Sequence, residues 1–139
     1  MRRFDEVHVG DVLPDTSRLV TRDGIAAYAD ASGDQNPLHR DDDVARAAGF
    51  DGVIAHGMLT MGHLASALVE WAGDGAALAA LRVQFRAPVF AGESITVGGR
   101  VTALDPARGT ATLDVWVSVE RGGELEWPIR RSEAEVRLA

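Results

Sequence analysis

The segment 57–72 most constrains what this chain of 139 residues can fold into. It is apolar on nearly every side of a helix, and its apolar side chains are Met58, Leu59, Met61, Leu64, Ala65, Leu68, Val69 and Trp71. A helix that is apolar all round has to be covered by other structure, because a surface helix keeps a polar face. The segment is shorter than a membrane span, contains His63 and Glu70, and is followed by Gly73 and Gly75. We therefore predict a buried central helix.

The second half of the chain alternates apolar and polar residues with a period of two, which is typical of half-buried antiparallel strands. The apolar positions of the four runs are Leu81, Val83 and Phe85; Ile95, Val97 and Val101; Leu113, Val115, Val117 and Val119; and Ala134, Val136 and Leu138. Residues 105–109 and 121–124 are the predicted turns between them. Such a meander has one buried face, which the central helix can fill. The predicted fold class is α+β, a curved antiparallel β-sheet around a long central helix.

The first half predicts shorter elements. Residues 1–21 look extended, and Thr21 can cap a short helix that Gly33 would end. Residues 33–39 form a loop, and residues 41–48 form a second short helix that begins with three aspartates. We interpret these aspartates as a solvated helix start. No repeat or linker interrupts the chain, so we expect one domain over residues 1–139.

Charge and composition exclude several classes of protein. The formal net charge is −7 and the arginines are scattered, so binding to nucleic acid or to an anionic membrane surface is not expected. The chain has no cysteine, which excludes disulfides, thiolate nucleophiles and cysteine-ligated metals. That absence suits a reducing compartment, and the first residues lack the apolar run of a secretory signal, so we expect a cytoplasmic protein.

The loop 33–39 carries the densest chemistry in the chain. It places the carboxylate of Asp34 and the imidazole of His39 five residues apart, and Pro37 stiffens the loop. Two such groups could reach one water molecule, and general acid–base catalysis of this kind gives roughly 10²–10⁴-fold per positioned group. The alternative is structural: Asp34 and Asn36 make local turn hydrogen bonds, and His39 is a satisfied side chain. The spacing alone favours this structural alternative.

Gly57 lies at the predicted start of the central helix, directly after His56. A helix N-terminus presents free N–H groups and the positive end of the helix dipole. Because Gly57 has no side chain, a substrate oxygen could approach its amide closely, and one such donor to an oxyanion is worth about 10²–10³ in rate. The alternative, that Gly57 permits tight packing between helix and sheet, fits the sequence equally well.

Residues 28–61 resemble the signature region of the MaoC-like dehydratase family, also called the (R)-specific enoyl-CoA hydratase or hydratase 2 family. The family pattern Gly-Asp-x-Asn-Pro-x-His, with an acidic residue two positions on, is met by residues 33–39 and by Asp41. The later His-Gly-Met is met by residues 56–58, and residues 83–93 resemble the segment that follows the central helix. The resemblance covers nearly the whole chain.

This resemblance implies the hotdog fold and a hydro-lyase. Such an enzyme hydrates trans-2-enoyl thioesters and dehydrates (R)-3-hydroxyacyl thioesters reversibly, in fatty-acid or polyketide-type metabolism. By the resemblance Asp34 and His39 would be the catalytic pair, and Gly57 would donate its N–H to the thioester carbonyl. Asn36 would hold the loop in shape. His56 and Met58 complete the candidate positions, for substrate binding or loop shaping.

The resemblance implies no cofactor and no metal, because coenzyme A or phosphopantetheine is part of the substrate. The expected partners are an acyl-CoA or an acyl-carrier protein, and a second hotdog subunit that covers the exposed sheet edge in a homodimer or a heterodimer. A zinc site shared by His56 and His63 is not expected, since seven helical positions separate them by about 10 Å.

Two other functions stay open on the sequence. A hotdog thioesterase would use a carboxylate on the central helix, where Glu70 is the only acid and lies far from Gly57. A non-catalytic or partner-dependent subunit of a heterodimer would have no need to keep Asp34 and His39. Arg40, Arg82 and Arg86 are candidate contacts for a coenzyme A or carrier arm, although a solvated role fits each of them better. Trp116 is a candidate for a dimer or crevice contact.

Overall fold

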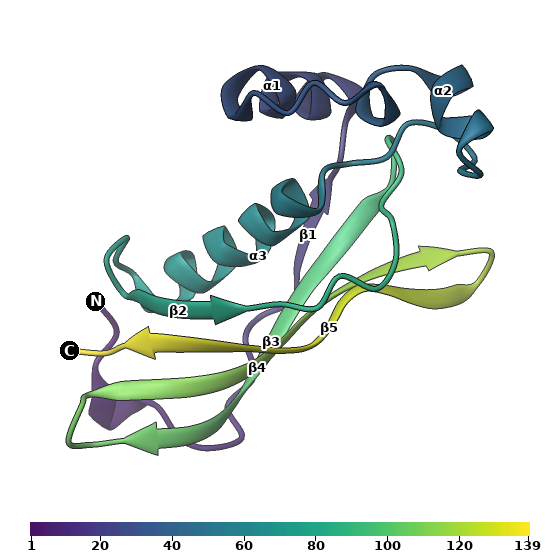
Figure 1. Ribbon diagram of the computed structural model, residues 1–139. Coiled ribbons are helices and arrows are strands. Elements are labelled where there is room, and N and C mark those ends of the chain that lie inside the picture. Colours follow the sequence, from purple (N-terminus) through teal and green to yellow (C-terminus); the bar gives the residue numbers. More distant parts are fainter.

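A computed structural model describes all of residues 1–139. The helices are α1 (Arg22–Ser32), α2 (Asp42–Ala47) and α3 (Gly57–Ala72), with 3-10 turns at Phe4–Glu6 and Pro37–His39. The strands are β1 (Thr16–Leu19), β2 (Leu78–Arg82), β3 (Ser94–Asp105), β4 (Thr110–Arg121) and β5 (Glu124–Arg137). They form one antiparallel sheet in the order β1-β3-β4-β5-β2, and α3 lies along one face of it (Figure 1).

The core lies between α3 and the inner face of the sheet. Its largest fully buried side chains come from α3, from the sheet and from α1, and include Ile25, Leu64, Leu68, Ile95, Leu113 and Ile129. Each such side chain contributes roughly 1.5–3 kcal/mol by leaving water. The predicted alternation in β3 and β4 is confirmed, because the apolar positions of both runs are buried in this core; they are Ile95, Val97, Val101, Leu113, Val115, Val117 and Val119. Both predicted turns join neighbouring strands of the meander.

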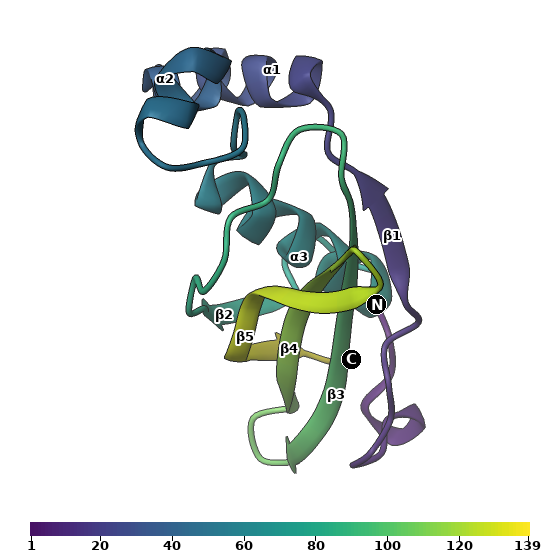
Figure 2. The same ribbon diagram turned by 90° about the vertical axis from the view of Figure 1, so that its right-hand side faces the viewer.

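Helix α3 is covered on one face only. Thr60, Leu64, Ala67, Leu68 and Ala72 are buried against the sheet. Met58, in contrast, is 57% exposed, so the predicted burial of the central helix is incomplete at this position in the single chain. The helix is apolar all round, yet the sheet of one chain curls around only part of it (Figure 2). An apolar face is therefore left at the N-terminal end of the helix.

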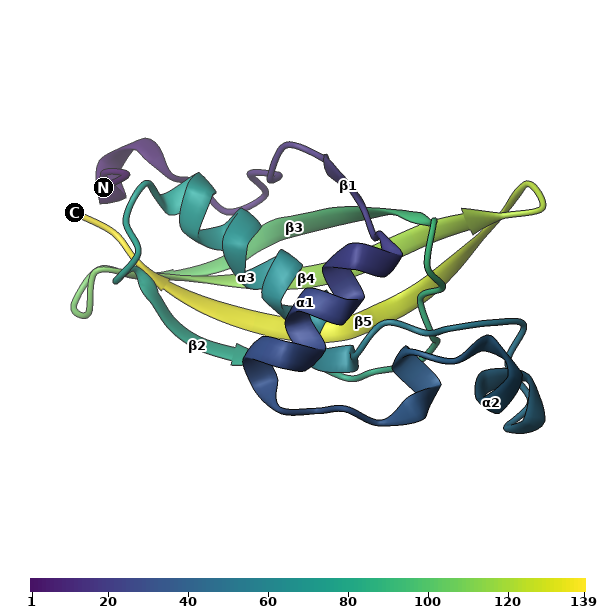
Figure 3. The same ribbon diagram turned by 90° about the horizontal axis from the view of Figure 1, so that it is seen from above.

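Helix α1 crosses above the N-terminal end of α3, and α2 lies to one side of it, as Figure 3 shows from above. Thr21 caps α1 as predicted, since its side chain accepts from the Gly24 N–H, and Gly33 ends the helix with a left-handed φ of 79°. Asp41 caps α2 by accepting from two backbone N–H groups. Gly33 and Asp41 thus fix the two ends of the loop between α1 and α2, which holds Asp34 and His39.

Two sequence-based expectations need correction. Residues 1–21 are not extended throughout, because Phe4–Glu6 is a 3-10 turn and β1 is only four residues long. Strand β2 ends at Arg82, so the predicted run does not continue through Val83 to Phe85, and Phe85 is 52% exposed instead of buried. The irregular β5 explains this end: Pro128 has no N–H to donate to a ladder, and the pairing with Phe85 shrinks to one isolated bridge to Ile129. No helix is long and apolar enough to cross a membrane.

Candidate functional site

The loop between α1 and α2 is held by its own side chains. Asp34 Oδ1 accepts from the Asn36 N–H at 3.2 Å, and Asn36 Oδ1 accepts from the Leu38 N–H at 3.1 Å. Asn36 thereby caps the 3-10 turn that carries His39. The local hydrogen bonds of the structural interpretation are therefore present. They leave the second carboxylate oxygen of Asp34 and the His39 ring available for chemistry.

The orientation of the His39 ring is set by a backbone carbonyl in the segment that precedes α3. Its Nδ1 atom lies 2.7 Å from the backbone carbonyl oxygen of Ile54. A carbonyl oxygen can only accept, so Nδ1 is the donor and Nε2 of the neutral ring carries the free lone pair. That Nε2 atom faces Asp34 Oδ2 at 3.9 Å. This distance is too long for a direct hydrogen bond, but one water molecule can contact both atoms.

His56 lies directly behind this pair. It is 3% exposed, and its ring stacks on that of His39 with centroids 3.8 Å apart and planes 24° apart. Its Nε2 atom donates to the backbone carbonyl of Asp34 at 3.0 Å, and the Tyr28 ring packs against the His56 ring with 4.8 Å between centroids. The Nδ1 atom of His56 is buried without a partner. His56 therefore contacts both members of the Asp34–His39 pair.

Gly57 opens α3, and neither its N–H nor that of Met58 has an acceptor in the chain. The amide borders a small hollow lined by Ile54, Gly57, Thr60, Phe85 and Pro128 among others. A Cβ atom at Gly57 would lie 3.2 Å from the Phe85 ring, so the glycine permits this close approach. Phe85 is a site residue that the sequence placed on a buried strand. Only the irregular pairing of residues 83–87 brings its ring over the helix N-terminus.

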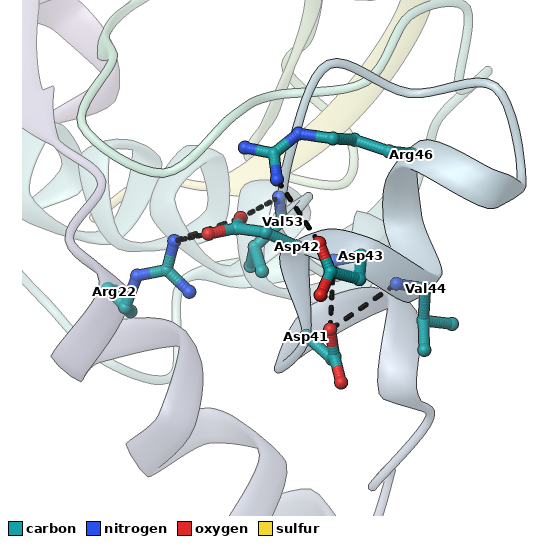
Figure 4. A network of polar contacts seen from close by, with 7 residues as sticks. All are labelled: Arg22, Asp41, Asp42, Asp43, Val44, Arg46 and Val53. Carbon is teal, nitrogen blue, oxygen red and sulfur yellow. Dashed lines mark hydrogen bonds and ion pairs between the residues drawn. The ribbon is translucent and has the colours of Figure 1, made fainter.

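A polar network fixes the residues that precede α3 (Figure 4). Asp42 Oδ1 accepts from the Val53 N–H at 2.9 Å, and the same carboxylate pairs with Arg22 at 2.8 Å. These hydrogen bonds, with that from Val53 as the largest cause, hold the pKa of Asp42 below its ordinary value. Asp41 and Asp43 match the prediction of a solvated helix start, but Asp42 links α1, α2 and the segment before α3.

Asp34, His39 and His56 also form a group whose potential metal-ligand atoms lie within 4.8 Å of one another. The stacking of the two imidazoles argues against a shared ion, because each lone pair points along its own ring plane and the planes are nearly parallel. Their other nitrogens are engaged with backbone carbonyls. The geometry suits acid–base chemistry better than ligation.

The remaining candidates are not gathered at the site. Arg40 pairs with Asp30 and Arg82 with Glu133, while Arg86 donates to Gln84. His63 lies further along α3, where burial and the nearby Arg18 lower its pKa. Trp116 packs over Gly98 on the outer face of the sheet, with Trp127 and Arg130 lining the same groove. Met58 is near Gly57 but exposed.

Comparison with known proteins gives one consistent result. Residues 5–121 match the family described as MaoC like domain. The chain is 36% identical over 111 residues to an (R)-specific enoyl-CoA hydratase of Aeromonas caviae, covering 76% of this chain and 82% of that protein. It is 31% identical over 119 residues to a 3-hydroxybutyryl-CoA dehydratase of Methylorubrum extorquens, covering 84% and 74%.

The likeness extends to solved structures. The (R)-hydratase from A. caviae involved in PHA biosynthesis superposes with a TM-score of 0.84 at 30% identity, covering 96% of this chain and 98% of that one. This confirms the predicted hotdog fold. Other relatives are longer: the chain spans about half (51%) of a mitochondrial 3-hydroxyacyl-[acyl-carrier-protein] dehydratase of Arabidopsis thaliana, to which it is 40% identical over 87 residues.

Proposed function

Because the chain belongs to the MaoC-like domain family, we propose that it hydrates trans-2-enoyl thioesters and dehydrates (R)-3-hydroxyacyl thioesters reversibly. One observation carries the proposal: the free lone pair of His39 Nε2 and the carboxylate oxygen of Asp34 face each other at 3.9 Å. Similarity to an (R)-specific enoyl-CoA hydratase and a 3-hydroxybutyryl-CoA dehydratase supports it. The acyl group is carried by coenzyme A or by an acyl-carrier protein.

The proposed hydration uses one water molecule held between the two side chains. Its oxygen forms a bond to C3 of the enoyl group as Asp34 and His39 together accept one proton. The electron pair of the double bond moves toward the carbonyl, where negative charge develops on the thioester oxygen. The Gly57 N–H and the positive end of α3 stabilise that charge. A proton from the pair then bonds to C2, so that H and OH are both added; dehydration is the reverse.

A thioesterase is disfavoured by the placement of Glu70. Its carboxylate pairs with Arg18 at 2.9 Å in the last turns of α3. The helix rises about 1.5 Å per residue, which puts Glu70 roughly 20 Å from the Gly57 amide. A carboxylate there cannot reach a carbonyl bound at the helix N-terminus.

We further propose that the active form is a dimer with a second hotdog subunit, either a second copy or a related chain. The sheet has open edges at β1 and β2, and the face of α3 that bears Met58 is left uncovered. Open edges and apolar faces of this kind are commonly covered by association. Light scattering on the purified chain tests whether a second copy is the partner, and a monomer that hydrates enoyl thioesters by itself would overturn the proposal.

The function is tested by following the loss of enoyl-thioester absorbance when the purified protein is given crotonyl-CoA and longer trans-2-enoyl-CoAs. Turnover that disappears in His39→Ala is expected. Free thiol released without hydration would support a thioesterase instead. If the wild-type protein turns over neither these enoyl-CoAs nor their carrier-bound forms, the result would support a non-catalytic subunit.

A further inference from the structure

Arg121, the last residue of β4, lies outside the site but binds residues 88–93. Pro88 and Val89 of this segment line the hollow at Gly57. Its Nε and Nη2 atoms donate to the Glu93 carboxylate at 2.7 and 2.8 Å. Nη2 also donates to the Pro88 carbonyl, and the guanidinium lies 4.9 Å from the centre of the Phe90 ring. The side chains of Arg121 and Glu93 are only 27% and 18% exposed, so water competes little with this ion pair. Arg121 therefore fixes residues 88–93 at both ends.

Residues 88–93 in turn hold the segment that precedes α3. Two backbone hydrogen bonds join them, Ala55 N–H to the Val89 carbonyl at 2.8 Å and Ala91 N–H to the Val53 carbonyl at 3.1 Å. Between these bonds lies Ile54, whose carbonyl oxygen accepts from His39 Nδ1 at 2.7 Å. Gly57 follows three residues later. Hydrogen bonds, joined by short stretches of backbone, thus connect Arg121 to the His39 ring.

We propose that Arg121, through its ion pair with Glu93, is a positioning residue for the His39 ring and the Gly57 amide. The proposal rests on the function proposed above. The ion pair touches no substrate and acts through residues 88–93 and the Ile54 carbonyl. If the pair is broken, that carbonyl gains freedom and the His39 ring is no longer held to one orientation. A misplacement of about 1 Å in a catalytic group can cost on the order of 10²-fold in rate.

The chain supplies a matched control. Arg108 also makes a two-point ion pair, with Glu135 at 2.7 and 3.2 Å, but at the turn between β3 and β4 at the other end of the sheet. Its side chain is 62% exposed. Arg108→Gln therefore removes a comparable ion pair without touching residues 53–57, and wild-type turnover is expected of it.

The experiment compares Arg121→Gln, Arg121→Lys and Arg108→Gln with the wild type in two ways. The first is kcat and KM with the enoyl thioester that the wild type hydrates. The second is the nitrogen NMR spectrum of the histidine rings, which reports whether Nδ1 or Nε2 of His39 carries the proton. For Arg121→Gln we expect kcat to fall by roughly 10- to 100-fold with little change in KM. We also expect a mixture of His39 tautomers. Lysine should give an intermediate loss.

Wild-type kcat and a wild-type His39 spectrum in Arg121→Gln would overturn the proposal, even if that variant is less stable. If Arg121→Gln does not fold, Arg121→Lys and Glu93→Gln carry the same comparison. Failure of the proposed function is a separate result, because the wild type itself would then be inactive. The NMR comparison still decides in that case: a changed His39 tautomer supports the positioning role, and an unchanged one overturns it.

Discussion

The imidazole rings of His39 and His56 are stacked with their centroids 3.8 Å apart, and the His56 ring also donates to the backbone carbonyl of Asp34. One buried side chain thus contacts both groups of the proposed catalytic pair. The stacked His56 ring supports the orientation of the His39 ring in which Nδ1 donates to the Ile54 carbonyl and Nε2 faces Asp34. His56 therefore supports the arrangement of this pair through its contacts with both residues.

Replacing His56 by alanine removes the stack and leaves the Asp34 carbonyl without its donor. We expect a loss of about 2–4 kcal/mol in the free energy of unfolding, because a buried ring and a buried hydrogen bond are both lost. We also expect a fall of at least about 10-fold in kcat. Urea unfolding and steady-state kinetics measure the two effects. His56→Gln, which can keep the donor, should be less harmful; an alanine variant with wild-type kcat would contradict a holding role.

Gly57→Ala tests the close approach at the start of α3. The added methyl group would meet the Phe85 ring at 3.2 Å and crowd the free amide. We expect kcat to fall by roughly 10- to 100-fold, as for a weakened oxyanion donor. Gly62→Ala is the matched control on the same helix, because a Cβ there meets nothing within 4 Å. That control should keep its activity and gain about 0.5–1 kcal/mol of stability. Equal kinetics in the two variants would count against the oxyanion role.

Glu93 gives the protein an acid-sensitive contribution to stability. Burial alone would raise its pKa, but hydrogen bonds from Arg121 and the Phe90 N–H outweigh burial and hold the pKa below its ordinary value of 4.5. A lowered folded-state pKa stabilises the fold above the unfolded value, and this is lost as the pH falls through the folded value. Glu93→Gln should cost about 1–3 kcal/mol at neutral pH. Its deficit against the wild type should shrink below about pH 4.5, measured by urea unfolding across that range. Parallel curves for the two proteins would disprove this linkage.

Much of the fold could be predicted from local signals. Thr21, Gly33 and Gly73 mark helix ends through capping and left-handed backbone, which depend on the residue itself. The end of β2 could not be predicted in this way. Residues 83–85 keep a period-two pattern, but whether they pair depends on β5, where Pro128 lacks an N–H and Arg131 has a φ of 52°. A strand's pattern does not reveal a defect in its neighbour.

The candidate site shows the same difference between local signals, which the sequence carries, and contacts that depend on tertiary packing. Asp34 and His39 lie in one short loop, so their spacing could indicate that they meet. The approach of His56 and Phe85 depends on tertiary packing, since His56 is 17 residues beyond His39 in the chain. The role of the Ile54 carbonyl was also hidden, because a backbone group leaves no trace in the residue type. The sequence therefore indicated the proposed reacting groups and named Asn36 and His56 as candidates that shape the loop, but it did not indicate the Phe85 ring or the Ile54 carbonyl.

The central claim is that Asp34 and His39 act as a unit on one water molecule. The most direct test is a double-mutant cycle on kcat for enoyl-thioester hydration, with Asp34→Asn, His39→Gln and the double variant. Asp34 is exposed and asparagine can still accept from the Asn36 N–H, so all three should fold. We predict that each single change lowers kcat by roughly 10²–10⁴-fold and that the double variant is no worse than the weaker single variant. Wild-type kcat in either single variant, or losses that multiply in the double variant, would contradict the account.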